Sequence, residues 1–176
     1  RVLRPDAKFL ELVHRLDRAT SGLIILAKSR PALLEMHRQM REGEIRKTYR
    51  LVVEGRWPKA LHKVDVPLDK RHKASGERMV KVSRDGKASL THFNIVQKEE
   101  DVTVLEAILK TGRTHQIRVH TLHAGHPILG DDRYFTLESK AITAKRNVKR
   151  LCLHSFRLKF TLYDEVIQVE APCPLS

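Results

Sequence analysis

The spacing of apolar residues predicts a strand, a helix and a second strand in the first third of the chain. The run from Leu23 to Ala27 is short and β-rich, which is typical of a buried strand. Ser29 can cap a helix with Pro31 in its first turn, and apolar positions recur at helical spacing until Gly43 ends the pattern. The segment KTYRLVVEG at 47–55 then alternates and predicts a strand.

The rest of the chain predicts mainly strands. Alternation at 91–95, a polar KEED turn and the apolar run 102–109 indicate a pair of strands. Two more strands are expected at 151–160 and 166–169, joined by a short turn.

One further helix is expected within TGRTHQIRVHTLHAGHP at 111–127. Thr114 could cap this helix, and Gly125 and Pro127 would close it. Two helices among strands joined mostly by short turns indicate an α+β fold on a mixed, mostly antiparallel sheet.

Length and composition favour one domain in a reducing compartment. The chain has 176 residues, enough for one core, and its longest apolar run is far too short to span a bilayer. Cys152 and Cys173 form no CxxC pair, which favours a cytoplasmic protein without a disulfide framework. No secretory signal opens the chain, and because it begins with Arg1 we expect it to be a piece of something longer.

The charge balance indicates a polyanionic partner. Lys and Arg total 34 against 21 Asp and Glu, a net charge of +13, and nucleic acid best matches such an excess. A merely basic protein is the alternative. The segment 69–87 is dense in Lys and Arg, and we expect an exposed arm, partly extended around Met79, Val80 and Val82, that contacts RNA or forms a loose loop.

Several kinds of chemistry lack their motifs. There is no GxxxxGK[ST], GxGxxG or GxSxG, and neither cysteine lies in a setting typical of a thiolate nucleophile. Four histidines crowd into twelve residues: His115, His120, His123 and His126. However, no HExxH occurs and no acid lies between Glu106 and Asp131, so a metal site is disfavoured. The acids of GDDRY, Asp131 and Asp132, are interpreted as a turn.

Asp17 is the candidate reactive group. It lies between Arg15 and Arg18 in HRLDRATSG at 14–22, and the two arginines favour its ionised form. A fixed carboxylate can act as a nucleophile or general base near a sugar ring. The alternative is a carboxylate that only caps or pairs within a turn.

Five motifs together resemble the RluA-type pseudouridine synthases. They are HRLDRATSG at 14–22, KTYRLVVEG at 47–55, TGRTHQIRVH at 111–120, HPILGDDRY at 126–134 and RLCLHSFRLKF at 150–160. The order and spacing match, and the likeness covers essentially the whole chain. SGERMVKVS at 75–83 is most similar to the C branch, whose enzymes act on the large ribosomal subunit.

The resemblance implies the pseudouridine synthase fold and a specific reaction. Such enzymes break the C1′–N1 bond of a uridine in RNA and rejoin the base through C5, with no metal, cofactor or energy source. Asp17 matches the essential aspartate, which attacks C1′ or removes the 2′ proton. Tyr49 matches a tyrosine that stacks on the base, Arg118 the basic partner of the aspartate, and Ile117 an apolar contact beneath the base.

The resemblance also implies contacts to RNA. Arg15 is expected to fill the gap left by the flipped nucleotide, or else to clamp a phosphate. Further RNA-binding side chains are expected at His14, Arg18, Lys47 and Arg113. Periodicity alone would also allow Tyr49 to be a core residue.

The family pattern extends beyond this sequence. Its NKPxG-type motif upstream of HRLD is missing, as is the S4-like RNA-binding domain of many members, so residues 1–176 are expected to be a catalytic domain. We expect a monomer acting on large-subunit ribosomal RNA, although transfer RNA stays open. The competing functions are an RNA-binding module without chemistry and a metal-dependent nuclease.

Overall fold

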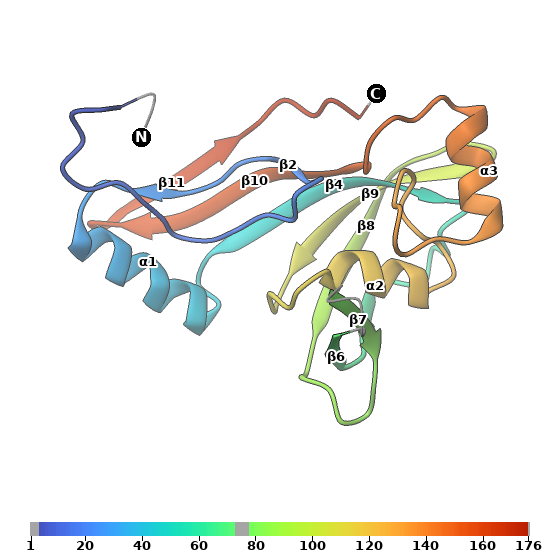
Figure 1. Ribbon diagram of the computed structural model, residues 1–176, viewed down its shortest axis with the longest axis horizontal. Helices are drawn as coiled ribbons and strands as arrows, with labels where there is room; N and C mark the ends of the chain where they lie inside the picture. The colour runs from blue at the N-terminus through green and yellow to red at the C-terminus, as the bar shows by residue number, and fades with distance from the viewer. Residues whose placement is uncertain (1–3, 73–77, 176) are drawn as a thin grey trace.

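The computed structural model describes residues 4–72 and 78–175. Within them the helices are α1 (Arg30–Glu42), α2 (Gln116–His123) and α3 (Leu137–Lys145). The central sheet has the strand order β11 (Glu165–Glu170), β10 (Leu153–Leu162), β4 (Arg46–Glu54), β9 (Val102–Leu109), β8 (Leu90–Lys98) and β5 (Lys63–Asp65), with β2 (Ser21–Gly22) beside β10. Two small sheets pair β1 (Glu11–Leu12) with β3 (Leu26–Ala27) and β6 (Leu68–His72) with β7 (Arg78–Val82). Helix α1 lies at one end of the molecule, α3 at the other and α2 between them (Figure 1).

The central sheet is mixed and mostly antiparallel, as the sequence predicts. Every pairing in it is antiparallel except that of β2, which runs parallel to β10. Strand β4 lies between β9 and β10, so its residue Tyr49 faces Ala107 on one side and Ser155 on the other. A central strand gives a side chain a fixed direction, because both of its backbone edges are hydrogen-bonded.

The largest core cluster forms around β4 and β9. Leu51, Val53 and Leu105 are fully buried there, and Trp57 packs on Phe93 with ring centroids 4.7 Å apart. This cluster supports the strands on which the candidate site is built.

Helix α1 forms where local signals predict it. The Ser29 side chain accepts a hydrogen bond from the Ala32 N–H, Pro31 lies in the first turn, and Gly43 caps the end with a left-handed φ of 70°. Met36 is buried in a second cluster, which contains Val13, Ala27 and Ile45 together with the outer end of β10.

Three secondary-structure predictions are wrong. Residues 23–25 form no strand, and the expected buried strand shrinks to β3, with Ile24 and Leu26 exposed by 42% and 48%. Helix α3, capped by Thr136, is missing from the prediction, which expected two helices. Thr114 caps nothing, since α2 begins after His115.

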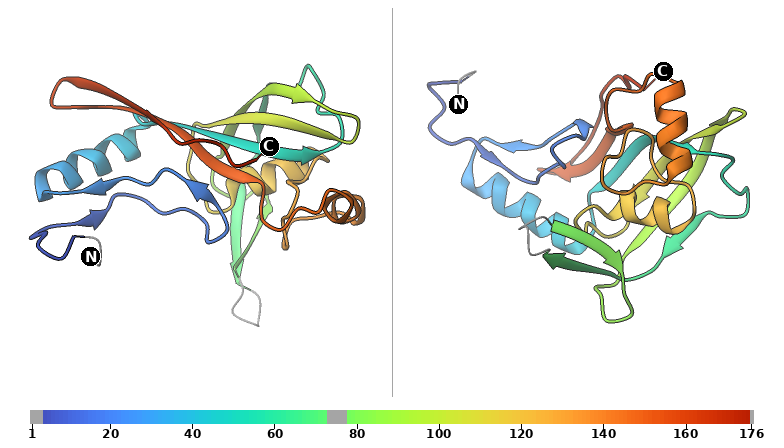
Figure 2. Two further views of the ribbon diagram at one scale, coloured as in Figure 1. Left: turned by 90° about the horizontal axis from the view of Figure 1, so that it is seen from above. Right: turned by 45° about the vertical axis from the view of Figure 1, so that its right-hand side comes forward.

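The predicted basic arm is an ordered hairpin in its described part. Strands β6 and β7 pair from Leu68 with Val82 to His72 with Arg78, and residues 73–77 lie outside the described residues. The hairpin projects from the sheet (Figure 2). Its base is fixed because Leu68 and Val80 pack with Val119 of α2 and with Tyr134.

Candidate active site

Hydrogen bonds fix both ends of the loop that carries Asp17. At its start, the His14 Nε2 accepts a hydrogen bond from the Ile25 N–H, and burial lowers the pKa of His14, with Lys47 adding to the effect. At its end, the Ser21 Oγ lies 2.8 Å from the His154 Nδ1.

Gly22 lets this loop lie directly on β10. Its φ is 109°, and a Cβ atom there would lie 2.2 Å from the Ser155 carbonyl oxygen. A side chain at this position would push the loop off the strand. The TSG part of the motif therefore provides a close backbone contact that holds the loop in place.

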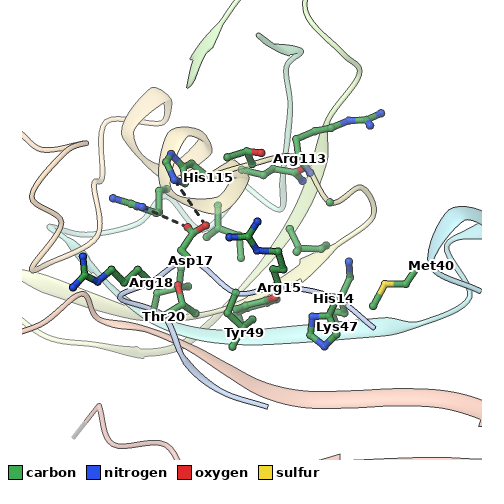
Figure 3. A pocket seen from close by; sticks show the side chains of 18 of the residues that line it. His14, Arg15, Asp17, Arg18, Thr20, Met40, Lys47, Tyr49, Arg113 and His115 are labelled. Carbon is green, nitrogen blue, oxygen red and sulfur yellow. Dashed lines mark hydrogen bonds and ion pairs between the residues drawn. The ribbon is translucent and has the colours of Figure 1, made fainter. Parts of the chain in front are cut away.

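The Asp17 carboxylate faces two nitrogen groups from α2 and its N-terminus. Oδ2 lies 3.4 Å from the Arg118 Nη1, and Oδ1 lies 3.8 Å from the His115 Nε2. Figure 3 shows Asp17 pointing toward His115, with both contacts drawn as dashed lines. The nitrogen groups nearest the carboxylate are therefore Arg118, which the family resemblance implied, and His115, rather than the flanking Arg15 and Arg18.

Arg118 is held in turn by a second acid. Its Nε and Nη2 donate to the two Asp131 carboxylate oxygens at 2.7 and 2.8 Å, and the Asp131 side chain is fully buried. Asp131 also accepts hydrogen bonds from the backbone N–H groups of Arg133 and Tyr134, so GDDRY is a turn built around this carboxylate. Burial opposes the charged form of Arg118, but the bonds to Asp131 and the charge of Asp17 raise its pKa.

Gln116, the first residue of α2, anchors the turn before the helix, and the N-cap residue His115 makes no side-chain capping bond. The Gln116 Oε1 accepts hydrogen bonds from the Arg113 N–H and the Thr111 hydroxyl, and the Gln116 Nε2 donates to the Leu90 carbonyl. These bonds fix the start of α2 against β8 and thereby place Arg118 over the loop. They also occupy the Arg113 N–H.

Tyr49 and Ile117 form the apolar wall below the carboxylate. Both are buried, and burial raises the pKa of the Tyr49 hydroxyl to about 12, with the charge of Asp17 adding to the rise. The phenol therefore stays protonated at neutral pH. A flat aromatic ring beside a carboxylate suits a base held next to its sugar.

These residues line one cleft of about 880 Å³. The nine predicted site residues all contribute to it: His14, Arg15, Asp17, Arg18, Lys47, Tyr49, Arg113, Ile117 and Arg118. Their roles in a reaction stay predictions.

Sequence reasoning missed part of the cleft and its support. Lys70 of the hairpin, Thr20, His115 and Arg133 also line it. Asp131 was seen only as a turn residue, although its place in a shared motif with Tyr134 was a usable signal. Burial lowers the pKa of the Lys47 ammonium group, which also lines the cleft.

Three of the four clustered histidines contact different parts of the structure. His115 approaches the Tyr134 hydroxyl, His120 contacts Thr91 and the Val66 carbonyl, and His126 contacts the Glu54 carbonyl. No group of three or more potential metal ligands converges within residues 4–72 and 78–175. Over the same residues, no helix is both long and apolar enough to cross a membrane.

Solved structures with the same architecture define the fold class. Human RNA Pseudouridylate Synthase Domain Containing 1 superposes with a TM-score of 0.82 at 24% identity, over 98% of this chain and 72% of that one. Human RNA Pseudouridylate Synthase Domain Containing 4 gives 0.76 at 24% identity, over 96% and 73%. The predicted pseudouridine synthase fold is thereby confirmed.

Sequence comparison then identifies the family. The RNA pseudouridylate synthase family model matches residues 2–123. The chain is 48% identical over 176 residues to Ribosomal large subunit pseudouridine synthase C of Salmonella typhimurium, covering 98% of this chain and 55% of that protein. The protein of the same name from Pasteurella multocida is 47% identical over 174 residues, with 98% and 53% covered. The chain belongs to the RNA pseudouridylate synthase family, with the likeness to the C branch that its sequence predicts, and spans about half the length of these relatives.

Proposed function

We propose that this chain is the catalytic domain of an enzyme that isomerises specific uridines of large-subunit ribosomal RNA to pseudouridine. The observation that carries the proposal is a carboxylate held between Arg118 and His115 at the wall of a cleft lined by Tyr49 and several cations. The names of the relatives supply the substrate class, large-subunit RNA.

The reaction needs a group that acts at the sugar while the base turns. Asp17 either attacks C1′ or removes the 2′ proton, and in both cases the C1′–N1 bond breaks. The uracil rotates over Tyr49 and C5 bonds to C1′, which displaces the Asp17 carboxylate in the first case and is accompanied by return of the proton to C2′ in the second. The C5 proton then leaves and N1 gains a proton. Arg118 holds the carboxylate directed at the sugar, since its other donors are fixed on Asp131.

The cleft cations are proposed to hold the RNA. Arg15 enters the space of the extruded nucleotide and offsets part of an unstacking cost of a few kcal/mol. Arg18, Lys47 and Arg113 bind neighbouring phosphates, with His14 supporting the loop. The enzyme is proposed to act in the cytoplasm as a monomer, without metal or cofactor.

Mapping pseudouridine on unmodified ribosomal RNA tests this function. Wild type and Asp17→Asn are incubated with the RNA in EDTA, and carbodiimide adducts are read as reverse-transcriptase stops. Stops at discrete uridines with wild type alone are expected. Binding without stops from either protein would favour an RNA-binding module, and RNA cleavage that EDTA abolishes would favour a nuclease.

A further inference from the structure

His115 occupies a backbone conformation that few side chains adopt. It precedes α2 with a left-handed φ of 54°, and its side chain makes no capping bond to the helix. Such a conformation is strained in a non-glycine residue and persists where surrounding contacts hold it. Here it directs the imidazole toward Asp17 (Figure 3).

A chain of hydrogen bonds favours one nitrogen of His115 as the site of the proton. The Val80 N–H of β7 donates to the Tyr134 hydroxyl at 2.9 Å. The hydroxyl oxygen lies 2.8 Å from the His115 Nδ1, so its own hydrogen can be donated there. Because the backbone N–H can only donate and occupies the oxygen, the hydroxyl hydrogen is free to point at Nδ1; in that arrangement Nδ1 accepts and the proton of a neutral imidazole lies on Nε2.

The surroundings favour this neutral form. Burial lowers the pKa of His115; the carboxylate of Asp17 opposes this shift, and the positive charge of Arg118 adds to it. A proton on Nδ1 would point at the Tyr134 hydroxyl oxygen, so the hydroxyl hydrogen could no longer be donated to that nitrogen. The titratable and charged groups facing the imidazole are Asp17, Arg118, Asp131, Arg133 and Tyr134.

We propose that His115 is a positioning residue for Asp17, with its tautomer set by Tyr134 so that Nε2–H faces the carboxylate. The present 3.8 Å separation is too long for a hydrogen bond. Such contacts often shorten when substrate is bound, and a movement of about 1 Å would form the bond. His115 and Arg118 then hold the two carboxylate oxygens separately, which leaves one orientation toward the sugar. The positioning role rests on the proposed function, whereas the tautomer does not.

Nitrogen NMR of the ¹⁵N-histidine-labelled chain tests the tautomer directly. The signals of His115 are assigned by their loss in His115→Gln. In wild type at neutral pH we expect a neutral ring protonated at Nε2, and in Tyr134→Phe a mixture of both tautomers. A wild-type ring protonated at Nδ1, or at both nitrogens, would overturn the proposal, whatever the activity.

Matched variants test the positioning. His115→Leu and His115→Gln share the backbone strain, but only glutamine keeps an N–H donor of similar reach. We expect His115→Leu to lower kcat on the order of 10²-fold with KM for RNA unchanged, and His115→Gln to recover most of that loss. The control is His123→Gln, an exposed histidine of the same helix, which should behave as wild type.

The activity results separate the two proposals. Equal activity of His115→Leu and wild type would overturn the positioning role. Equal losses in the leucine and glutamine variants, accompanied by lower melting temperatures, would mean a structural role only. Absence of isomerisation by wild type with the Nε2–H tautomer intact would count against the proposed function and the positioning role, while the tautomer assignment would stand.

Discussion

Arg118 contacts two acidic side chains, Asp131 and Asp17, that have different roles. Its bidentate bond goes to the buried Asp131, which leaves Nη1 for Asp17 across the cleft. An arginine suits this task because its planar fork fixes both partners at once. The site is therefore supported by a carboxylate that never needs to touch RNA.

Removing the charge of Asp131 tests that support. Asp131→Asn leaves Arg118 buried beside a neutral amide, so the free energy of unfolding should fall by about 3–5 kcal/mol. Urea denaturation measures the change. Asp132→Asn is the matched control, because that side chain is 91% exposed and lies 3.9 Å from Arg118. Its stability should stay within about 0.5 kcal/mol of wild type. Equal stabilities of the two variants would contradict the support role.

Sequence reasoning located the cleft residues but not what holds them. Asp17, Tyr49 and Arg118 were found because specific motifs carry them. The contacts of Asp131 and Tyr134 are tertiary, since their partners Arg118 and His115 lie on another element. The motif HPILGDDRY marked Asp131 and Tyr134, but it did not show that the Asp131 carboxylate is buried against Arg118.

The helices differ in how far the neighbouring sequence alone predicts where they begin and end. Helix α1 carries a serine cap, an early proline and a final glycine, so it could be predicted. Helix α3 has little apolar periodicity, its Leu137 is exposed, and its capping box uses Ser139 in place of the usual Glu or Gln. The start of α2 depends on the Gln116 bonds to β8, which only the tertiary structure supplies.

Helix α2 and the adjacent loop make stability sensitive to acid. Burial lowers the pKa of His14, His115 and His120 below 6.5 in the folded protein. The unfolded chain then binds more protons near that pH, so the stabilisation is full above 6.5 and is lost as the pH falls through the folded-state values. Urea denaturation at about pH 7.5 and about pH 5.5 should show lower stability at the acid value. Equal stability at both would contradict the buried neutral state.

Part of the positive charge of the whole molecule lies at the cleft. Seven of its cations line the cleft: Arg15, Arg18, Lys47, Lys70, Arg113, Arg118 and Arg133. Lys70 belongs to the hairpin, so the projecting element contributes a cation to the cleft. Charge at the sequence level indicated nucleic acid, and the fold shows where that charge gathers.

RNA binding should therefore depend steeply on salt. With about four phosphate contacts, affinity should fall roughly 50- to 150-fold between about 50 and 200 mM salt. Filter binding or fluorescence anisotropy measures the slope, and Lys70→Gln should reduce it by about one unit. Lys145→Gln, an exposed lysine of α3 paired with Asp101, is the control and should not change it. A salt-independent affinity would contradict phosphate binding by the cleft.

The central claim is that Asp17 drives an isomerisation in which C5 of uridine loses its proton. The most direct measurement uses RNA with tritium at C5 of its uridines, incubated with wild type and Asp17→Asn in EDTA. The account predicts that wild type releases tritium to water while the RNA keeps its length, and that the variant releases none. Release by Asp17→Asn at the wild-type rate, or RNA binding by wild type without release, would contradict it.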